Sequence, residues 1–289
     1  MALRVIGIGD NVADHYLHTN MIYPGGNAFN FAAYAKMLGA EAAYMGVFGD
    51  DFPGTHVYNT GLELGICLDR CRIYHGENGC PKVKLENGER IFVSSNRGGV
   101  SRERPLTLDE DDIAYISTFQ LIHTSINSYI EHNLPRMFAT GVPISFDFST
   151  YGSDIYFKAY CPYITYSIVS CGHLSHQETL NMISKLHGFG SGNVIATRGA
   201  EGSIFSDGHK IYHQKAHMVE AIDTMGAGDA YLTAFLLKYI SWNLENKEKT
   251  IDHQQRETAI LAVMEEASRF AAQICMIEGA FGHGVPYKK

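Results

Sequence analysis

The stretch AIDTMGAGDAYLTAFLL, residues 221–237, places two glycines and an aspartate directly before an apolar run that is typical of a helix. Backbone amides at the start of a helix have no intrahelical acceptors, so they attract anions such as phosphate. Two interpretations of Asp229 follow. Its carboxylate is a helix cap after a tight loop, or it accepts a proton beside an anion hole formed by the amides of Gly226, Ala227 and Gly228.

Two better-known glycine motifs do not fit this stretch. A Walker A loop requires Gly-Lys-Ser/Thr, but Gly228 is followed by Asp229, and the nearest lysines are Lys215 and Lys238. A dinucleotide fingerprint requires a third glycine early in the chain, whereas Tyr231 stands at that position late in the chain. A phosphate site here would therefore differ from both.

The composition favours a single α/β domain that acts on a small molecule. A chain of 289 residues with 45% hydrophobic residues can bury a large core, and one domain spanning 1–289 is ordinary. The formal net charge is -8, and no long lysine or arginine cluster occurs, which argues against a nucleic-acid partner. The six cysteines form no CxxC pair. Without a signal-peptide pattern or a long apolar run, we expect a cytoplasmic protein with no membrane partner.

Strand-like and helix-like segments alternate along most of the chain. Short apolar runs predict strands at 4–9, 42–49, 119–125, 143–149, 166–170 and 193–199. Longer amphipathic or apolar segments predict helices at 27–38, 53–64, 129–139, 175–186, 228–240 and 251–274. Such alternation predicts a mostly parallel sheet covered by helices on both faces, with ligands at the carboxyl ends of the strands.

Two segments interrupt this alternation. Residues 14–26 and 71–99 lack helical periodicity, and the sequence ENGE at 86–89 predicts a hairpin turn. We expect a small β-sheet lid with segments at about 14–24 and 71–99, or alternatively an edge hairpin with no lid role. The glycine-rich C-terminal segment is interpreted as the end of the core.

Two motifs resemble the signatures of the ribokinase-like (PfkB-type) carbohydrate kinases. DTMGAGDA at 223–230 is similar to the C-terminal signature of that family, and YPGGNAFNFAAYAKMLGA at 23–40 is similar to the N-terminal one. TRGAEGS at 197–203 resembles the segment that lies beside the nucleotide phosphates. The resemblance implies a three-layer α/β/α sandwich with a β-sheet lid, and an ATP-dependent kinase that acts on a sugar or sugar-amine.

The resemblance also implies roles for individual residues. Asp229 is the expected catalytic base, beside the anion hole of 226–228. The expected sugar-binding residues are Asp14, Gly25, Gly26 and Asn30, with Asp10 as a weaker candidate. Thr197, Gly199 and Gly202 are expected near the nucleotide.

Metal binding departs from the family pattern at one position. Members usually carry Asn-x-x-Glu where this chain has Ser175 to Glu178, so Glu178 alone is expected to orient Mg²⁺ through water. Asp223 lies where some members bind a monovalent cation such as K⁺.

The acceptor is inferred from likeness alone. Segments 8–16, 24–35, 121–135 and 144–149 resemble the fructoselysine 6-kinase group, which implies transfer of phosphate to O6 of fructoselysine. Arg97 is the candidate to meet the amino-acid end of such a substrate. Other acceptors (ribose, fructose, ketodeoxygluconate or a nucleoside), a catalytically silent sugar- or nucleotide-binding regulator, and a homodimer formed through the lid all stay open.

Overall fold

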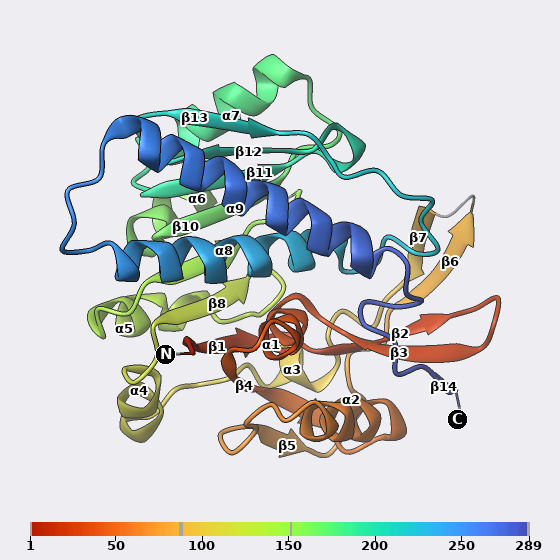
Figure 1. The fold of residues 1–289 in the computed structure, drawn as a ribbon. Coiled ribbons are helices and arrows are strands. Elements are labelled where there is room, and N and C mark those ends of the chain that lie inside the picture. The colour runs from red at the N-terminus through yellow and green to blue at the C-terminus, as the bar shows by residue number, and fades with distance from the viewer. Residues whose placement is uncertain (1, 87–88, 151, 288–289) are drawn as a thin grey trace.

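A nine-stranded sheet forms the centre of the computed structural model, which describes residues 2–86, 89–150 and 152–287 (Figure 1). The strands from β11 to β5 run parallel, and the edge strands β12 and β13 are antiparallel. The predicted mostly parallel sheet is therefore confirmed. In spatial order the strands are β13 (Ile211–Gln214), β12 (Ser203–Ser206), β11 (Asn193–Thr197), β10 (Tyr166–Ser170), β9 (Ile144–Asp147), β8 (Leu121–Ser125), β1 (Arg4–Gly9), β4 (Glu41–Gly49) and β5 (Arg72–Tyr74).

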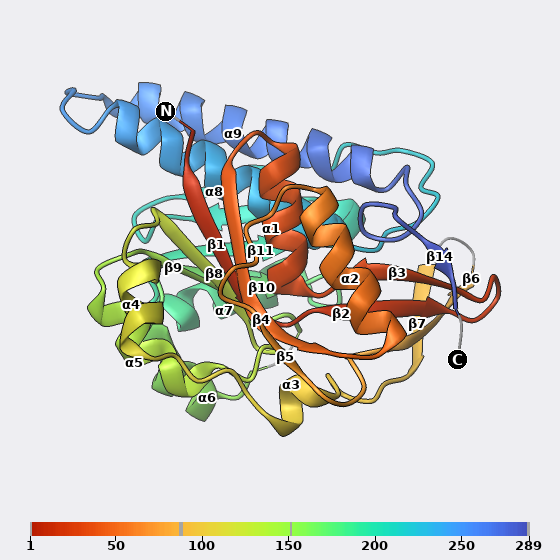
Figure 2. The same ribbon diagram turned by 90° about the horizontal axis from the view of Figure 1, so that it is seen from below.

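Helices cover both faces of this sheet, as Figure 2 shows from below. One face is covered by α1 (Asn27–Met37), α2 (Phe52–Glu63), α8 (Ala227–Glu245) and α9 (His253–Ile274). The other face carries α3 (Val100–Glu103), α4 (Glu110–Ile116), α5 (Leu134–Ala139), α6 (Asp154–Tyr160) and α7 (His176–Gly188). Each set buries its own hydrophobic core against the sheet, so the three-layer α/β/α sandwich is confirmed. None of the helices in the described ranges is long and apolar enough to cross a membrane.

A second, five-stranded sheet projects from one end of the large sheet (Figure 1). Its strands, in spatial order, are β14 (Val285–Pro286), β3 (Met21–Gly25), β2 (Val12–Tyr16), β6 (Lys82–Glu86) and β7 (Glu89–Ser94). The antiparallel pair β6 and β7 confirms the predicted hairpin, although its turn at 87–88 lies outside the described residues. We call this five-stranded sheet the lid sheet.

The predicted lid boundaries are wrong at two places. β5 pairs in parallel with Val47–Gly49 of β4, so residues 72–74 extend the large sheet rather than the lid. Conversely, β14 from the C-terminal segment pairs with β3. Its two residues are too few to show any periodicity in the sequence, which explains why the segment is interpreted there as the end of the core.

Several short elements also escape the sequence pattern. The structure adds β12, β13, α3, α4 and α6, and short 3₁₀ turns at η2 (Cys161–Tyr163) and η3 (Gly199–Glu201). The predicted helix at 129–139 is a 3₁₀ turn, η1 (Glu131–Asn133), followed by α5. Elements of three to seven residues span at most two helical turns, so amphipathic periodicity cannot identify them.

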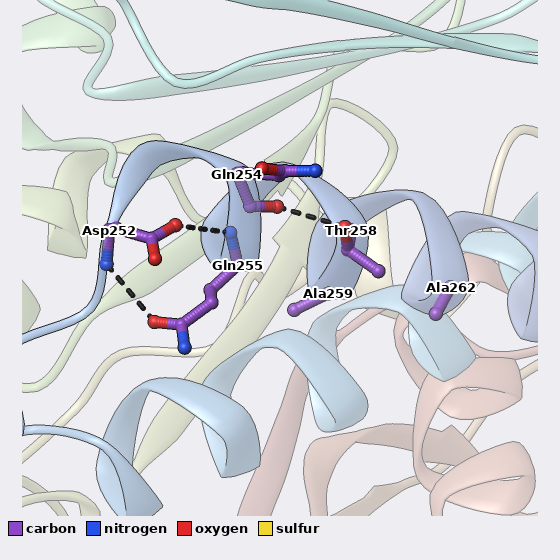
Figure 3. Close-up of a pocket in the computed structure, with 6 residues that line it drawn as sticks. All are labelled: Asp252, Gln254, Gln255, Thr258, Ala259 and Ala262. Atoms are coloured by element: carbon purple, nitrogen blue, oxygen red, sulfur yellow. Dashed lines mark hydrogen bonds between the residues drawn. The ribbon is translucent and has the colours of Figure 1, made fainter.

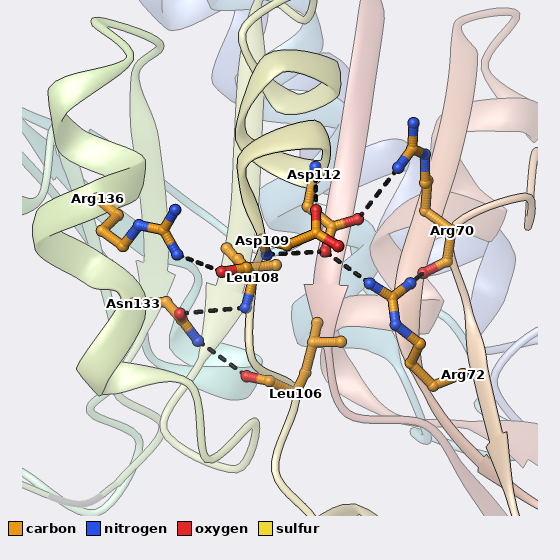
Figure 4. A network of polar contacts seen from close by, with 8 residues as sticks. All are labelled: Arg70, Arg72, Leu106, Leu108, Asp109, Asp112, Asn133 and Arg136. Atoms are coloured by element: carbon orange, nitrogen blue, oxygen red, sulfur yellow. Dashed lines mark hydrogen bonds and ion pairs between the residues drawn. The ribbon is translucent and has the colours of Figure 1, made fainter.

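A buried carboxylate ties α4 to the β5 edge of the large sheet (Figure 4). Asp112 is fully buried, and its carboxylate lies 2.6 Å from the guanidinium of Arg72 and 3.6 Å from that of Arg70. On the other side of the same loop, Asn133 donates to the carbonyl of Leu106. These contacts hold the connection between β7 and β8 against the sheet.

Candidate active site

The start of α1 is fixed by a carboxylate from the end of β1. The Oδ2 atom of Asp10 accepts the amide of Asn27 at 2.6 Å, and Oδ1 accepts the amide of Ala28 at 3.3 Å. The hydroxyls of Ser125 and Ser128 donate to Oδ1 at 2.9 and 2.8 Å. Asp10 therefore caps α1 from a distant part of the chain, which leaves little acceptor capacity for the sugar contact predicted for it.

Close backbone packing at the start of α1 requires glycine. Gly26 has φ 104°, and a Cβ there would lie 2.6 Å from the Cα of Asn11. A Cβ on Gly25 would lie 2.3 Å from Oδ2 of Asp14, a buried residue of β2. The two glycines thus bring the lid strands and α1 together around Asp14, as the sequence motif predicts.

Two asparagines on the first turn of α1 hold the carboxylate of Asp229. Asn27 donates through Nδ2 to Oδ1 of Asp229 at 2.7 Å, and Asn30 donates through Nδ2 to Oδ2 at 2.6 Å. Asn30 is buried, and its Oδ1 has no hydrogen-bond partner. A buried acceptor of this kind is costly unless a ligand satisfies it, so Asn30 points to a bound donor beside Asp229.

A second carboxylate lies beside Asp229. Nδ2 of Asn27 also donates to Oδ2 of Asp147 at 2.8 Å, so a single amide group bridges the two acids. Burial, and then the charge of Asp229, raise the pKa of Asp147 to about 7. The site therefore holds a buried acid whose charge changes near neutral pH.

A buried histidine completes this arrangement. Nε2 of His123 lies 2.7 Å from Oδ1 of Asn27, and Nδ1 lies 2.9 Å from the hydroxyl of Ser145. His123 lies on β8 and is fully buried. The sequence analysis assigns no role to Asn27, His123, Ser145 or Asp147, although all four lie in segments that contribute to the resemblance.

The glycine turn before α8 has two differently constrained glycines. Gly226 has φ 73°, and a Cβ there would lie 2.2 Å from the hydroxyl oxygen of Tyr34. Gly228 lies in the first turn of α8, and a Cβ there would meet nothing within 4 Å. Glycine at 226 is required by the fold, whereas the open space at 228 suits a ligand that approaches the backbone.

Comparison with known proteins agrees with this geometry. The model of the pfkB family carbohydrate kinases matches residues 4–137 and 169–268. Fructosamine kinase FrlD of Bacillus subtilis (strain 168) is 39% identical over 99% of this chain and 95% of its own length. The chain belongs to the PfkB family of carbohydrate kinases. It is therefore a phosphotransferase that acts on a sugar hydroxyl and uses ATP.

Further relatives agree in fold and in class. Fructoselysine 6-kinase of Escherichia coli (strain K12) is 31% identical over 79% of this chain and 86% of its own length. The structure of Arabidopsis thaliana ribokinase complexed with ribose and ATP superposes with a TM-score of 0.77 at 18% identity, covering 98% of this chain and 96% of that one. This structural likeness shows a ribokinase-like fold.

The segment predicted to lie near the nucleotide ends close to the start of α8. Thr197 ends β11, and the hydroxyl of Ser203 donates to that of Tyr231 on α8 at 2.6 Å. Gly199 and Gly202 have positive φ values of 56° and 96°. A Cβ on Gly202 would lie 2.0 Å from a backbone oxygen of β13, so that glycine is needed for packing.

Arg198 is held by the protein itself. Its guanidinium lies 2.6 Å from the carboxylate of Glu201 and donates to the carbonyl of Leu174 at 3.2 Å. The side chain of Arg198 is only 9% exposed and is already paired with Glu201. It therefore does not extend into solvent, and its guanidinium is not free to bind a phosphate.

Glu178 takes part in a capping box at the start of α7. Its amide donates to the hydroxyl of Ser175, and its Oε2 accepts the amide of Ser175 at 2.9 Å. The hydroxyl of Ser175 also donates to Oε2, and this bond is the largest cause of a lowered pKa for Glu178. Serine at 175 therefore fixes an ionised carboxylate whose Oε1 atom can still accept a bond from a metal-bound water.

Asp223 is surrounded by hydrogen-bond donors rather than by acceptors. Its fully buried carboxylate accepts the hydroxyl of Tyr16 and the amides of Met225 and Gly279, the two amides at 2.9 Å each. Donor groups direct protons at the carboxylate, whereas K⁺ requires oxygen lone pairs around it. This carboxylate therefore links the lid strand β2, the C-terminal loop and the glycine turn, and the monovalent cation expected at Asp223 stays a prediction.

Arg97 lies just after the lid strand β7. Its φ is 55°, its backbone carbonyl accepts the hydroxyl of Tyr129 at 2.9 Å, and its side chain is exposed. Its predicted contact with the amino-acid end of a substrate stays a prediction.

A surface hollow at the start of α9 does not belong to this site (Figure 3). α8 has 19 residues, which corresponds to a length of about 28 Å. Because α9 begins beside the C-terminal end of α8, the hollow lies one helix length from Asp229. It is lined by Asp252, Gln254, Gln255, Thr258, Ala259 and Ala262.

Replacing Gly228 with alanine separates helix stability from ligand approach. We expect Gly228→Ala to keep or raise the Tm, because alanine is favoured over glycine in a helix by up to about 1 kcal/mol. The added methyl occupies the open space before the helix start, so we expect kcat/KM for ATP to fall by about tenfold or more. Gly188→Ala, at a helical glycine that also has open space, is the control. Unchanged ATP kinetics in Gly228→Ala would show that phosphate does not approach this turn.

The raised pKa of Asp147 predicts a loss of stability between acid and neutral pH. The folded chain keeps the proton on Asp147 up to about pH 7, whereas the unfolded chain releases it near the ordinary aspartate pKa of 3.8. The free energy of unfolding should therefore decrease as the pH rises through this window. Urea unfolding from pH 4 to 8 should show a steeper decrease for the wild type than for Asp147→Asn. Equal slopes would contradict the assignment, and Asp154→Asn, at an exposed carboxylate, is the control.

Proposed function

We propose that this kinase transfers the γ-phosphate of ATP to O6 of fructoselysine, giving fructoselysine 6-phosphate and ADP. The observation that carries the acceptor is the 39% identity, over almost the whole chain, with a protein named fructosamine kinase. The match to a fructoselysine 6-kinase at 31% identity supports it. Other acceptors of the family, which include ribose and fructose, are the alternatives.

Asp229 supplies the proton acceptor of this reaction. The sugar O6–H gives its proton to the carboxylate of Asp229 while O6 forms a bond to the γ-phosphorus, and the bond from that phosphorus to the β,γ-bridging oxygen of ATP breaks. Asn27 and Asn30 hold both carboxylate oxygens, which fixes the direction from which the hydroxyl approaches. The carboxylate is therefore oriented before the substrate arrives.

The amides at the start of α8 stabilise the transferred phosphoryl group. Gly226, Ala227 and Gly228 precede Asp229 at a helix start, where the helix dipole and first-turn amides favour negative charge. The carboxylate of Asp229 and the amides of the proposed anion hole belong to one continuous turn. The distance between the carboxylate and these amides is therefore set by local backbone geometry. Thr197 and Gly199 are proposed to line the nucleotide side of this turn.

Mg²⁺ is the metal that we include in the proposal. Glu178 would hold it through water, and bound to the ATP phosphates it would neutralise charge on the transferred group. The capping box fixes this carboxylate from one side only, which fits a role through water. A monovalent cation such as K⁺ near Asp223 stays a prediction.

The sugar is proposed to lie between the lid sheet and α1. Asp14 and the unpartnered Oδ1 of Asn30 offer acceptors for sugar hydroxyls, and Gly25 and Gly26 allow the close approach of the two elements. The linking ammonium of fructoselysine requires a nearby carboxylate, because a buried charge without a partner is costly. Asp147, whose ionisation is suppressed by burial and by Asp229, would be stabilised in its charged form by such an ammonium.

Exposed apolar side chains on the lid strand β7 support a homodimer through the lid. Ile91, Phe92 and Val93 are 44%, 57% and 50% exposed, which is unusual for three consecutive large apolar residues. Ile91 and Val93 lie on one face of the strand and Phe92 on the other, so a second copy packed against one face of the lid sheet would cover that face alone. We include this homodimer in the proposal.

The base assignment is tested by Asp229→Asn. The amide keeps the size of the carboxylate and removes the proton acceptor, so we expect kcat to fall by roughly 10²–10⁴-fold with ATP affinity largely unchanged. Steady-state kinetics and calorimetric ATP titration measure the two effects, with Asp154→Asn as the control. Near-normal kcat would remove Asp229 from the mechanism, and a wild type that binds sugar and ATP without turnover would favour the silent regulator.

The acceptor assignment is tested by comparing fructoselysine with fructose. We expect kcat/KM for fructoselysine to exceed that for fructose by at least about tenfold, which corresponds to about 1.4 kcal/mol of transition-state binding. Arg97→Ala should narrow this ratio and leave fructose turnover nearly unchanged, whereas Arg269→Ala, at an exposed arginine of α9, should leave the ratio as in the wild type. A preference for free fructose, ribose or a nucleoside would overturn the fructoselysine assignment and leave the kinase assignment in place.

A further inference from the structure

His123 is a neutral imidazole buried in the middle of the large sheet. It is fully buried on β8, and its ring stacks on Phe31 with 4.6 Å between ring centroids. Burial lowers the pKa of His123 to about 3, so the ring is uncharged near neutral pH. A neutral imidazole has one N–H donor and one nitrogen acceptor.

The hydrogen bonds around His123 can run in one direction only. Nδ2 of Asn27 directs its two N–H groups at the carboxylates of Asp147 and Asp229, so Oδ1 of Asn27 must accept from His123. Reversing the amide would place its oxygen against Oδ1 of Asp229 and Oδ2 of Asp147, which would repel it whenever both acids are ionised, and would direct its N–H groups at the imidazole. Nε2 of His123 therefore carries the hydrogen, and Nδ1 accepts the hydroxyl of Ser145.

We propose that His123 is a positioning residue for phosphoryl transfer, which holds Asn27 in the orientation that donates to Asp229. The proposal rests on the proposed function in taking Asp229 as the base. Ser145, His123 and Asn27 form a chain of donors that starts on β9, crosses β8 and ends at the carboxylate pair. Without the imidazole donor, Oδ1 of Asn27 is a buried acceptor with no partner, and the amide loses the contact that fixes its rotation.

The charged groups around Asp147 and Asp229 determine how loss of the His123 donor should change the titration of this carboxylate pair. Asp229 on α8 faces Asp147 from β9, whose pKa is also raised by the charge of Asp10 at the end of β1. Within the described chain, no lysine or arginine forms an ion pair with Asp10 or Asp147. The backbone amide of Ser149 and the side-chain amide of Asn27 both donate to Asp147 and lower its pKa, against the larger effect of burial. Loss of the Asn27 donor should therefore move the titration of the pair to higher pH.

Three variants separate positioning from packing. His123→Phe keeps an aromatic ring against Phe31 and removes both ring nitrogens, whereas His123→Gln keeps an N–H donor within reach of Asn27. His187→Phe makes the same exchange on α7, at a histidine that also bonds through both nitrogens, to Ser191 and Ser206. His187→Phe therefore removes two hydrogen bonds of a histidine, as His123→Phe does, but at a position outside the proposed active site.

The kinetic test follows the reaction with whichever sugar the wild type phosphorylates. We expect His123→Phe to lower kcat by about tenfold or more with KM for ATP within about twofold, and to move the acid limb of the kcat/KM profile up by about one pH unit. His123→Gln should restore kcat to within about threefold of the wild type. His187→Phe should leave the acid limb where it is in the wild type.

A second readout does not depend on turnover. Carboxyl ¹³C NMR titration of aspartate-labelled protein should show higher titration midpoints for Asp147 and Asp229 in His123→Phe, and wild-type midpoints in His123→Gln and His187→Phe. Unchanged midpoints and an unchanged acid limb in His123→Phe, with a lower Tm alone, would overturn the proposal and make His123 a packing residue. If the wild type does not phosphorylate fructoselysine, the proposed function fails, and the NMR titration still decides the role of His123.

Discussion

The active site depends on the hydrogen bonds by which Asp10 caps α1. This carboxylate at the end of β1 fixes the amides of Asn27 and Ala28. The hydroxyls of Ser125 at the end of β8 and of Ser128 in the following loop fix the carboxylate in turn. The start of α1 is thereby placed at the carboxyl ends of the central strands. Because α1 carries the asparagines that hold Asp229, the orientation of this carboxylate follows from a contact made by another element.

The same arrangement concentrates negative charge in a buried place. Asp147 and Asp229 share one amide donor, and mutual repulsion together with burial keeps the pKa of Asp147 near 7. The nearest histidine is held neutral by burial, so it can orient Asn27 without adding positive charge. A site of this kind is electrostatically incomplete without a cationic ligand, which suits an acceptor that carries an ammonium group.

The parts of the site that were predicted from the sequence share one property, namely that they lie within a short local motif. Gly226 to Asp229 form one turn, and Gly25 to Asn30 form the start of one helix, so spacing along the chain reports their geometry. The capping box of Ser175 and Glu178 is equally local. The family resemblance, however, predicts only a metal-orienting role for Glu178 and treats Ser175 as the replacement of an asparagine. Arg198 and Asp223 also lie in these motifs, but hydrogen-bond partners of their side chains, Leu174 and Gly279, come from other segments of the chain. The motifs alone therefore do not predict these contacts.

The sequence by itself determined the α/β class, the glycine turn that precedes Asp229 and α8, and membership of a kinase family, because helix starts and glycine turns are encoded by neighbouring residues. Only the tertiary structure decided that Asn27 bridges two carboxylates and bonds to His123, that β5 joins the large sheet instead of the lid, and that β14 adds a strand to the lid sheet. The physical reason is that these contacts join residues roughly a hundred or more positions apart, or strands of two or three residues. Hydrogen-bond direction and strand pairing at such separations are set by packing of the whole chain, which no local pattern encodes.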